Sequence, residues 1–261
     1  MSKKKNTLLR NTSILMAATI ISRVIGLLYR SPLGETIGNE GLGYYSTASN
    51  LYTILLLISS YSIPMAVSKI VSERLALKEY RNAHRVFRGA LLYAVIVGGI
   101  AALVAFFGGK FLLPYNQQNA ILALRVLAPT IFFSAILGVL RGYFQAHSTM
   151  MPTSISQIIE QIFNAAFSIG AAWFFIQQFA TNDTERAKFG AAGGTLGTGA
   201  GVLAGLCFML LVYGVNRKSI LRKAAKDIRH REESYREIFQ VLFLMVTPVI
   251  FTTFIYNLSL I

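Results

Sequence analysis

The stretch Asn11–Arg30, NTSILMAATIISRVIGLLYR, has the length and apolar content of a membrane-spanning helix, yet it carries Arg23 in its interior. At ~1.5 Å per residue, Arg23 lies about 18 Å into the segment, near the middle of a ~30 Å hydrocarbon core. A cation at that depth costs at least ~2.5 kcal/mol on insertion scales, so it normally faces the protein interior or a wet cavity. The stretch therefore predicts a transmembrane helix with a ligand or ion path beside it.

The composition of the whole chain also points to a membrane protein. Of its 261 residues 54% are hydrophobic and only 14% are charged, and the mean hydropathy is +0.54, which is too apolar for an ordinary soluble domain. A net charge of +14 could suit nucleic acid, but the cations alternate with apolar runs of spanning length, so we expect no nucleic-acid partner. No spacing typical of a metal site or of catalytic groups occurs, so we expect no metal, no cofactor, no catalytic residue and no enzyme activity.

The apolar runs predict an all-α, polytopic membrane helical bundle, because open sheets cannot cross lipid. We expect a six-helix N-terminal membrane lobe over residues 1–214, a basic cytoplasmic linker helix over 215–237, and the truncated start of a second lobe over 238–261, so that the chain is a fragment. The expected spans are 11–30, 44–68, 89–107, 120–140, 154–179 and 190–213, followed by a seventh that begins at 238.

The distribution of lysine and arginine predicts the orientation of these spans. When loops are assigned alternately to the two sides, one side receives nineteen of these residues and the other three, Lys110, Arg186 and Lys188. The positive-inside rule then places the N-terminus in the cytoplasm. The basic segment 217–236 is expected to lie on the anionic inner leaflet, or to be a solvated linker helix.

Two of the expected spans carry a polar face. Residues three, four or seven apart fall on one side of a helix. In the first span these are Thr12, Thr19, Arg23, Gly26 and Arg30, and in the fifth span they are Gln157, Glu160, Gln161, Asn164 and Ser168.

These faces allow two interpretations of Arg23. It can form a buried ion pair with Glu160 that locks the first span to the fifth, or it can line a cavity that accepts an anion. Arg125 in the fourth span lies at a depth similar to that of Arg23 and either joins this cavity or extends outward to the membrane surface. The polar face of the fifth span either lines the cavity or forms hydrogen bonds between helices.

Glycine recurs every four residues in the sixth span, at Gly193, Gly197, Gly201 and Gly205. Small residues at this spacing form a groove that lets another helix approach closely. We therefore predict a tight helix contact along this side.

Several stretches resemble the lipid-linked saccharide flippases related to MurJ, in the stage V sporulation protein B-like branch of the polysaccharide biosynthesis transporters. The resemblance covers essentially the whole chain. It is carried by Ser22–Gly26 (SRVIG), Gly41–Tyr45 (GLGYY), Ile63–Val71 (IPMAVSKIV), Arg141–Gln145 (RGYFQ) and Met151–Gln161 (MPTSISQIIEQ).

The resemblance implies a two-lobe transporter fold like that of the MATE proteins, of which this chain is the N-terminal lobe plus the start of helix 7. It implies that Arg23 and, by a looser match, Arg30 bind the diphosphate of a lipid-linked precursor such as lipid II. Arg125 is a further candidate because of its depth, and not because of the resemblance. Asn50 occupies the region of a further cavity arginine found in such proteins. The expected polar cavity face is Thr19, Asn50, Gln157, Glu160, Gln161 and Asn164.

The function implied is flipping of an undecaprenyl-diphosphate saccharide across a bacterial plasma membrane for cell-wall or polysaccharide synthesis. The expected partners are this substrate, the membrane lipids, and a C-terminal lobe of the same protein. The alternative is a cation-coupled multidrug antiporter of the same superfamily, which would need acidic side chains in the membrane. Only Glu160 meets that need.

Overall fold

The computed structural model describes residues 2–225, 227 and 233–258, and within these residues it contains helices and no strands. The prediction of an all-α membrane bundle is confirmed. The side chain of Thr12 lies outside the described part. The helices are α1 Ser2–Leu28, α2 Arg30–Leu56, α3 Ile63–Ala76, α4 Tyr80–Leu112, α5 Ile121–Ala146, α6 Met151–Phe179, α7 Asp183–Ala225 and α8 Tyr235–Leu258, with a π-helical turn η1 Leu57–Tyr61 and a 3-10 turn η2 Tyr115–Ala120.

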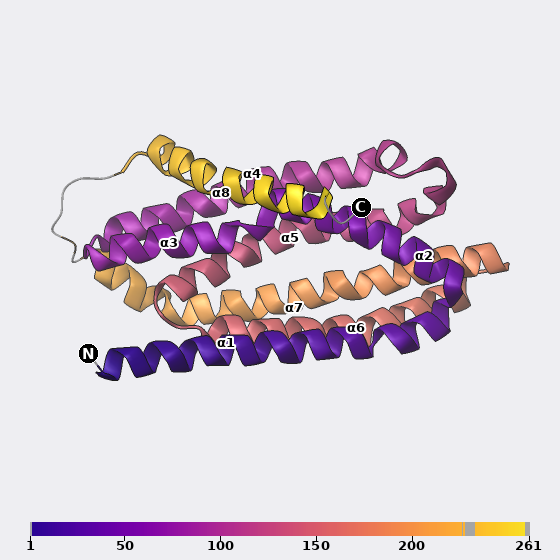
Figure 1. Cartoon of the computed structure of the whole chain (residues 1–261), viewed down its shortest axis with the longest axis horizontal. Helices are drawn as coiled ribbons and strands as arrows, with labels where there is room; N and C mark the ends of the chain where they lie inside the picture. The colour runs from indigo at the N-terminus through magenta and orange to yellow at the C-terminus, as the bar shows by residue number, and fades with distance from the viewer. Residues whose placement is uncertain (1, 226, 228–232, 259–261) are drawn as a thin grey trace.

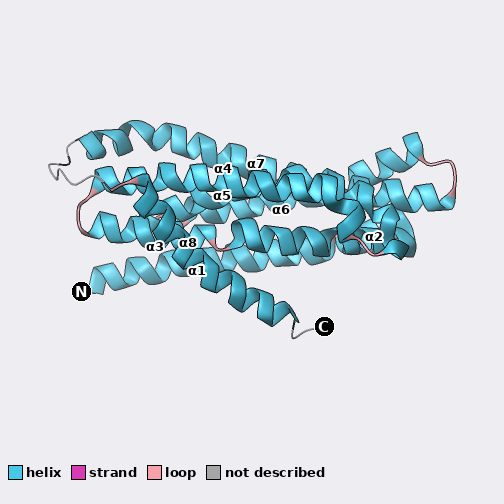
Figure 2. Ribbon diagram, turned by 90° about the horizontal axis from the view of Figure 1, so that it is seen from above, coloured by secondary structure: helices cyan, strands magenta, loops and turns pink. Residues whose placement is uncertain are grey.

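Most helices run along the long axis of the molecule in two layers (Figure 1). One layer contains α1, α6 and α7, and the other contains α3, α4 and α5. The helix α2 crosses from the first layer to the second at the end far from the N-terminus, and α5 packs against α7 to join the layers. The helix α8 contacts α3 and α4 and leaves the bundle obliquely toward its C-terminal end (Figure 2).

By length and composition, α4, α5 with η2, α6 and α7 can each cross a membrane. Ser13–Leu28 and Arg30–Leu56 add a fifth crossing if this pair, bent by 41°, forms one span. Seven spans were expected, whereas within the described residues four or five segments meet these criteria of length and composition. The outer surface of α4 exposes large apolar side chains, as a lipid-facing helix does, including Leu92, Ile96, Ile100, Leu103 and Phe107.

The segment expected as one span over 44–68 is instead divided. The helix α2 begins fourteen residues earlier, at Arg30, and Gly38 in it has a φ of 73° that side-chain-bearing residues rarely adopt. The π-helical turn η1 then separates α2 from α3, whose first turn contains Pro64. Proline lacks the backbone N–H needed inside a helix but suits a helix start, which explains why a new helix begins here.

Two stretches that carry the family resemblance meet where α3 crosses α5. A Cβ atom added to Gly142 would lie 2.5 Å from the Pro64 carbonyl oxygen, so only glycine permits this approach. The Ser72 hydroxyl also donates a hydrogen bond to the carbonyl of Ala146, at 3.3 Å. This crossing holds the end of α5 in position, and Arg141 lies there.

The predicted close contact of the glycine-rich span is confirmed, and its partner is α6. Added Cβ atoms at Gly193, Gly197 and Gly201 would lie 2.3–2.6 Å from backbone atoms of α6. Such contact between backbones fixes the position of α6 along α7. Two members of the polar face of α6, Asn164 and Ser168, lie in this contact, where the Ser168 hydroxyl donates a hydrogen bond to the Gly194 carbonyl at 2.8 Å.

The helix α7 has 43 residues, or about 64 Å at ~1.5 Å per residue, which is twice a ~30 Å hydrocarbon core. Its last turns, including Arg217 and Arg222, therefore extend beyond the apolar part of the bundle. The expected linker helix 215–237 is not a separate element up to Ala225, because those residues continue α7. Residues 226 and 228–232 of the expected linker lie outside the described residues.

Candidate functional site

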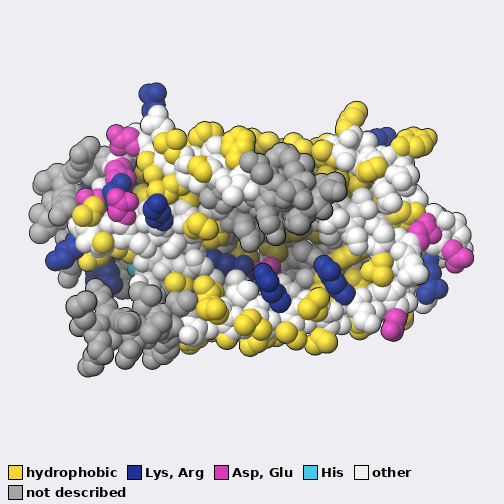
Figure 3. Space-filling model, viewed as in Figure 1, with side chains coloured by type: hydrophobic (Ala, Val, Ile, Leu, Met, Phe, Trp, Pro, Cys, Tyr) yellow, Lys and Arg dark blue, Asp and Glu magenta, His cyan; other side chains and the backbone are white. Residues whose placement is uncertain are grey.

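A cavity of about 640 Å³ lies beside α1 and α6 and is open on one side. In the space-filling view, a hollow in the middle of this face contains lysine or arginine side chains, within a surface that is otherwise largely apolar or uncharged (Figure 3). The lining residues are Thr19, Ser22, Arg23, Gly26, Leu27, Tyr29, Arg30, Arg141, Gln157, Glu160, Gln161 and Asn164.

The two polar faces expected from the sequence meet in this cavity. The helix α1 packs along α6, and a Cβ atom at Gly26 would lie 3.5 Å from the Gln161 side-chain oxygen. The two polar faces therefore lie against each other at this point. Seven of the nine residues proposed from the sequence line the cavity: Thr19, Arg23, Arg30, Gln157, Glu160, Gln161 and Asn164.

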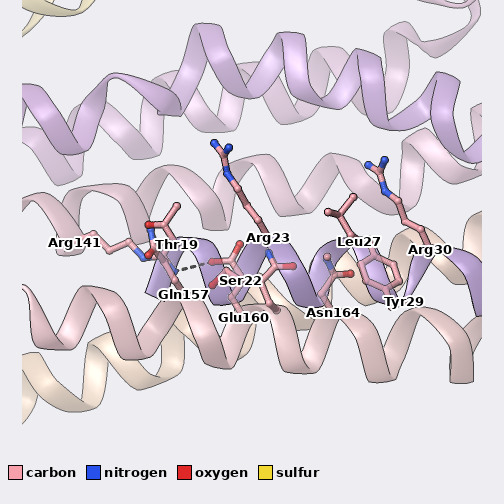
Figure 4. A pocket seen from close by; sticks show the side chains of 12 residues that line it. Thr19, Ser22, Arg23, Leu27, Tyr29, Arg30, Arg141, Gln157, Glu160 and Asn164 are labelled. Carbon is pink, nitrogen blue, oxygen red and sulfur yellow. Dashed lines mark hydrogen bonds and ion pairs between the residues drawn. The ribbon is translucent and has the colours of Figure 1, made fainter. Parts of the chain in front are cut away.

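Arg23 and Arg30 extend into the open part of the cavity. Figure 4 shows both side chains pointing in the same direction, away from α6. Both are exposed, and in the part of the chain that the structure describes neither has a carboxylate within 4 Å. Their charges are therefore available to a ligand.

Glu160 pairs with Arg141, at 2.7 Å between a guanidinium nitrogen and a carboxylate oxygen (Figure 4). The Arg141 Nε also donates to the Ser156 hydroxyl at 2.9 Å, and both charged side chains are largely buried. The interpretation in which Arg23 pairs with Glu160 is therefore wrong. Among the described lining residues, three arginines and one glutamate leave a formal charge of +2.

Two polar atoms of the cavity are buried without a hydrogen-bond partner among the described residues. They are the Ser22 hydroxyl and the side-chain oxygen of Gln157. Buried polar groups in proteins nearly always have a partner, and in a polar cavity of this size that partner is water or a ligand. The cavity is therefore suited to polar contents.

Two residues proposed from the sequence lie outside this cavity. Arg125 is exposed, with its guanidinium 5.8 Å from the centre of the Phe106 ring and its Nε donating to the Phe106 carbonyl at 3.4 Å. It therefore lies against α4. Asn50 is exposed on α2 and does not line the cavity.

Sequence reasoning missed Arg141, Ser22, Leu27 and Tyr29 as lining residues. The predicted fourth span ends at residue 140, directly before Arg141, whereas α5 continues through Arg141 to Ala146. The observed helix ends bring its partner within reach, because Arg141 lies five residues before the end of α5 and Glu160 nine residues after the start of α6. At ~1.5 Å per residue their depths differ by about 6 Å, which a long arginine side chain spans.

Comparison with solved structures identifies the class of fold. The crystal structure of MATE in complex with MaD3S matches 98% of this chain and 55% of that protein, with a TM-score of 0.76 at 15% identity. A MOP superfamily transporter from Pyrococcus furiosus, described as having a reverse polarity of its binding pocket, matches 96% of this chain and 54% of its own, with a TM-score of 0.69 at 16% identity. The chain is thus a multi-pass helical membrane protein with the fold of MOP-superfamily transporters.

Sequence comparison identifies the family more narrowly. The family model described as polysaccharide biosynthesis protein matches residues 8–259, so the chain belongs to that family.

Two curated Bacillus subtilis relatives are similar over nearly the whole chain. Lipid II flippase MurJ is 26% identical over 254 residues, which are 94% of this chain and 46% of MurJ. Stage V sporulation protein B is 27% identical over 262 residues, covering 98% of this chain and 48% of that protein. The chain spans about half the length of these relatives.

Proposed function

We propose that this chain forms the N-terminal half of a flippase that moves a lipid-linked saccharide, carried on undecaprenyl diphosphate, to the outer leaflet. The observation that carries the proposal is the charge of the cavity. Arg23 and Arg30 have no ionic partner among the described residues, while Glu160 is occupied by Arg141. The cavity therefore offers positive charge to an anion within a bundle of apolar helices.

A diphosphate suits this arrangement chemically. Guanidinium groups stay protonated at any physiological pH, and their planar set of donors matches phosphate oxygens. Arg23 and Arg30 are seven residues apart, about 10 Å at ~1.5 Å per residue, and both line the cavity. Their long side chains can converge on one diphosphate, and Ser22 and Gln157 offer polar atoms to the group or to its water.

The charge balance supports this function over a multidrug antiporter. An antiporter that binds sodium, protons or cationic drugs needs an accessible acidic side chain in the membrane. Glu160 is the only acid among the described lining residues, and its ion pair with Arg141 competes with any cation. Glu160 instead holds Arg141 at the cavity wall, so that a substrate phosphate could compete for the same guanidinium.

The proposed membrane placement has the N-terminus in the cytoplasm of a bacterium and the chain in its plasma membrane. The α3–α4 turn, the α5–α6 turn and the end of α7 lie at the same end of the bundle as the N-terminus (Figure 1). That end carries most of the lysines and arginines, as the positive-inside rule requires of the cytoplasmic side. In this proposal residues 1–214 form one lobe, 215–237 connect it, and 238–261 begin a second lobe that supplies the other wall of the cavity.

Reconstitution of the full-length protein tests the proposal. Proteoliposomes would contain a fluorescent undecaprenyl-diphosphate saccharide, and its transfer between leaflets would be followed by quenching with a membrane-impermeant reagent. We expect transfer above that of protein-free liposomes, and no transfer of the same saccharide on an uncharged lipid. Efflux of a cationic dye down an imposed sodium or proton gradient, without transfer of the diphosphate lipid, would instead establish the antiporter.

A further inference from the structure

Two buried tyrosines lie where α1 joins α2. Tyr29 stands between these helices, which meet at an angle of 41°, and it lines the cavity. Tyr45 ends the stretch Gly41–Tyr45, which carries part of the family resemblance. The hydroxyl groups of the two tyrosines form a buried hydrogen bond of 3.0 Å. The bond therefore joins the bend to a part of α2 that lies sixteen residues farther along the chain.

A reversal of the chain within α2 brings the two tyrosines together. Gly38 has a φ of 73°, so the helical path is interrupted there. A Cβ atom added to Gly34 would lie 2.9 Å from a side-chain carbon of Leu42, so the parts of α2 before and after Gly38 lie side by side. The bend between α1 and α2 is thus held against a second segment of the same chain.

Tyr45 is in turn held by the contact between α6 and α7. A Cβ atom added to Gly194 of α7 would lie 3.3 Å from the Tyr45 ring, and the Tyr45 hydroxyl interacts with the side chain of Thr198. The Thr198 hydroxyl donates to the side-chain oxygen of Asn164 at 3.5 Å. The tyrosine pair therefore connects the bend to the helices whose backbones are in direct contact.

The position of Arg30 depends on this connection. Arg30 follows Tyr29 directly, as the first residue of α2, and it lies close enough to act electrostatically on the Tyr45 hydroxyl. Figure 4 shows the Tyr29 ring and the Arg30 side chain directed to opposite sides of the chain. Consecutive residues share a planar peptide unit, so holding the Tyr29 ring also limits the direction in which Arg30 leaves the backbone.

An uncharged anchor leaves the charge of Arg30 available. Arg141 is held in the same cavity by the carboxylate of Glu160, and this ion pair neutralises it. Tyrosine hydroxyl groups stay protonated at physiological pH, so they do not compete with an anion for a guanidinium. The tyrosine pair therefore combines a fixed bend with an arginine that keeps its charge.

We propose that Tyr29 and Tyr45 are positioning residues, which hold Arg30 toward the diphosphate through the hydrogen bond between their hydroxyl groups. This inference rests on the proposed function of the cavity. Without the bond the angle between α1 and α2 varies more widely. Arg30 must then be ordered when the ligand binds, which reduces its contribution to affinity.

A double-mutant cycle in the full-length protein tests this role, with undecaprenyl diphosphate as the probe in lipid nanodiscs and undecaprenol as the uncharged comparison. We expect Tyr29→Phe to weaken binding about fivefold, the usual cost of one hydrogen bond, and Arg30→Gln to weaken it about tenfold. In the Tyr29→Phe background, Arg30→Gln should cost only about twofold, because Arg30 is then already poorly placed. Arg23→Gln should cost the same factor in both backgrounds, and Tyr45→Phe should reproduce the effect of Tyr29→Phe.

Tyr52→Phe is the matched control. It removes a hydroxyl group of α2 that forms a 3.4 Å hydrogen bond with Ser134 and does not line the cavity. This variant should change neither the affinity nor the cost of Arg30→Gln. An equal cost of Arg30→Gln with and without the Tyr29 hydroxyl, or an equal coupling of Tyr29 to Arg23, would overturn the positioning role.

Hydrogen exchange without ligand separates this role from the proposed function. Across the bend, the backbone N–H of Tyr29 donates to the Ile25 carbonyl at 3.2 Å, and that of Leu33 donates to the Tyr29 carbonyl at 3.1 Å. We expect Tyr29→Phe to speed amide exchange in residues 29–33 about fivefold, and Tyr52→Phe to leave it unchanged. Equal binding of undecaprenyl diphosphate and undecaprenol by the unmodified protein would refute the proposed function. Exchange would then decide alone: unchanged rates at 29–33 in Tyr29→Phe would overturn the tyrosine anchor, and faster rates would support it.

Discussion

Replacing Glu160 with glutamine should strengthen the binding of a diphosphate lipid. The change removes the single carboxylate among the described lining residues and raises the formal charge of the cavity from +2 to +3. It also releases Arg141 from its 2.7 Å ion pair, so that this guanidinium can turn toward a ligand. Glutamine preserves the size of the side chain and one oxygen for the hydrogen bond.

Coulomb's law sets the size of the effect. A unit charge at ~6 Å contributes roughly 0.7 kcal/mol at the permittivity of water and roughly 2.8 kcal/mol at an effective permittivity of ~20. The effective permittivity of an open cavity lies between these limits. We therefore expect Glu160→Gln to strengthen the binding free energy by about 1.4 kcal/mol, which lowers Kd about tenfold. By the same reasoning Gln157→Glu lowers the formal charge to +1 and should weaken binding about tenfold.

The assay is binding of undecaprenyl diphosphate to the full-length protein in lipid nanodiscs, with undecaprenol as the uncharged comparison. Glu35→Gln is the matched control, because it removes an exposed acid of α2 that does not line the cavity. Its Kd should not change. Weaker binding by Glu160→Gln with an unchanged unfolding temperature, or unchanged binding by Gln157→Glu, would refute the electrostatic reasoning.

Three further predictions concern packing, pH and the outer arginine. Gly197→Ala should lower stability by about 2 kcal/mol, because its Cβ would lie 2.3 Å from the Ser168 backbone nitrogen, whereas Gly214→Ala in the same helix meets nothing within 4 Å and should have little effect on thermal unfolding in detergent. Burial lowers the pKa of His147, between α5 and α6, below its ordinary value of 6.5, so the unfolded state takes up more protons and stability should fall as pH decreases through 6.5. His147→Phe should remove this part of the pH dependence of unfolding, and an unchanged slope would contradict it. Arg125→Gln should leave diphosphate binding unchanged in the nanodisc assay, since Arg125 lies against α4 outside the cavity; a loss comparable to that of a cavity variant would contradict this placement.

The sequence was sufficient to predict the features that depend on local periodicity. A polar face in an apolar helix must avoid lipid, so the faces of Arg23 and Glu160 could be assigned to the protein interior before their contact was known. The structure brings these two faces together around one cavity. The glycine repeat from Gly193 likewise predicted a close contact, because small side chains have few other uses at this spacing.

The features that sequence reasoning missed depend on tertiary packing. The partner of Glu160 depends on how far α5 extends and on where α5 crosses α3, at Gly142. Neither feature can be predicted from the hydropathy of the sequence. Arg125 has the same local pattern as a cavity arginine, but the rotation of α5 directs it toward Phe106. Hydropathy also gave no sign of the π-helical turn before α3.

In the proposed function, Arg23 holds the diphosphate of a lipid-linked saccharide. Arg23→Gln and Arg125→Gln, made in the full-length protein, give the most direct comparison, because each removes one arginine and only the first lies in the cavity. Both variants would be expressed at equal levels in cells depleted of their own lipid II flippase, and growth would be measured. We predict that Arg125→Gln restores growth and Arg23→Gln does not. Full restoration of growth by Arg23→Gln, where the unmodified protein also restores it, would show that Arg23 does not hold the diphosphate.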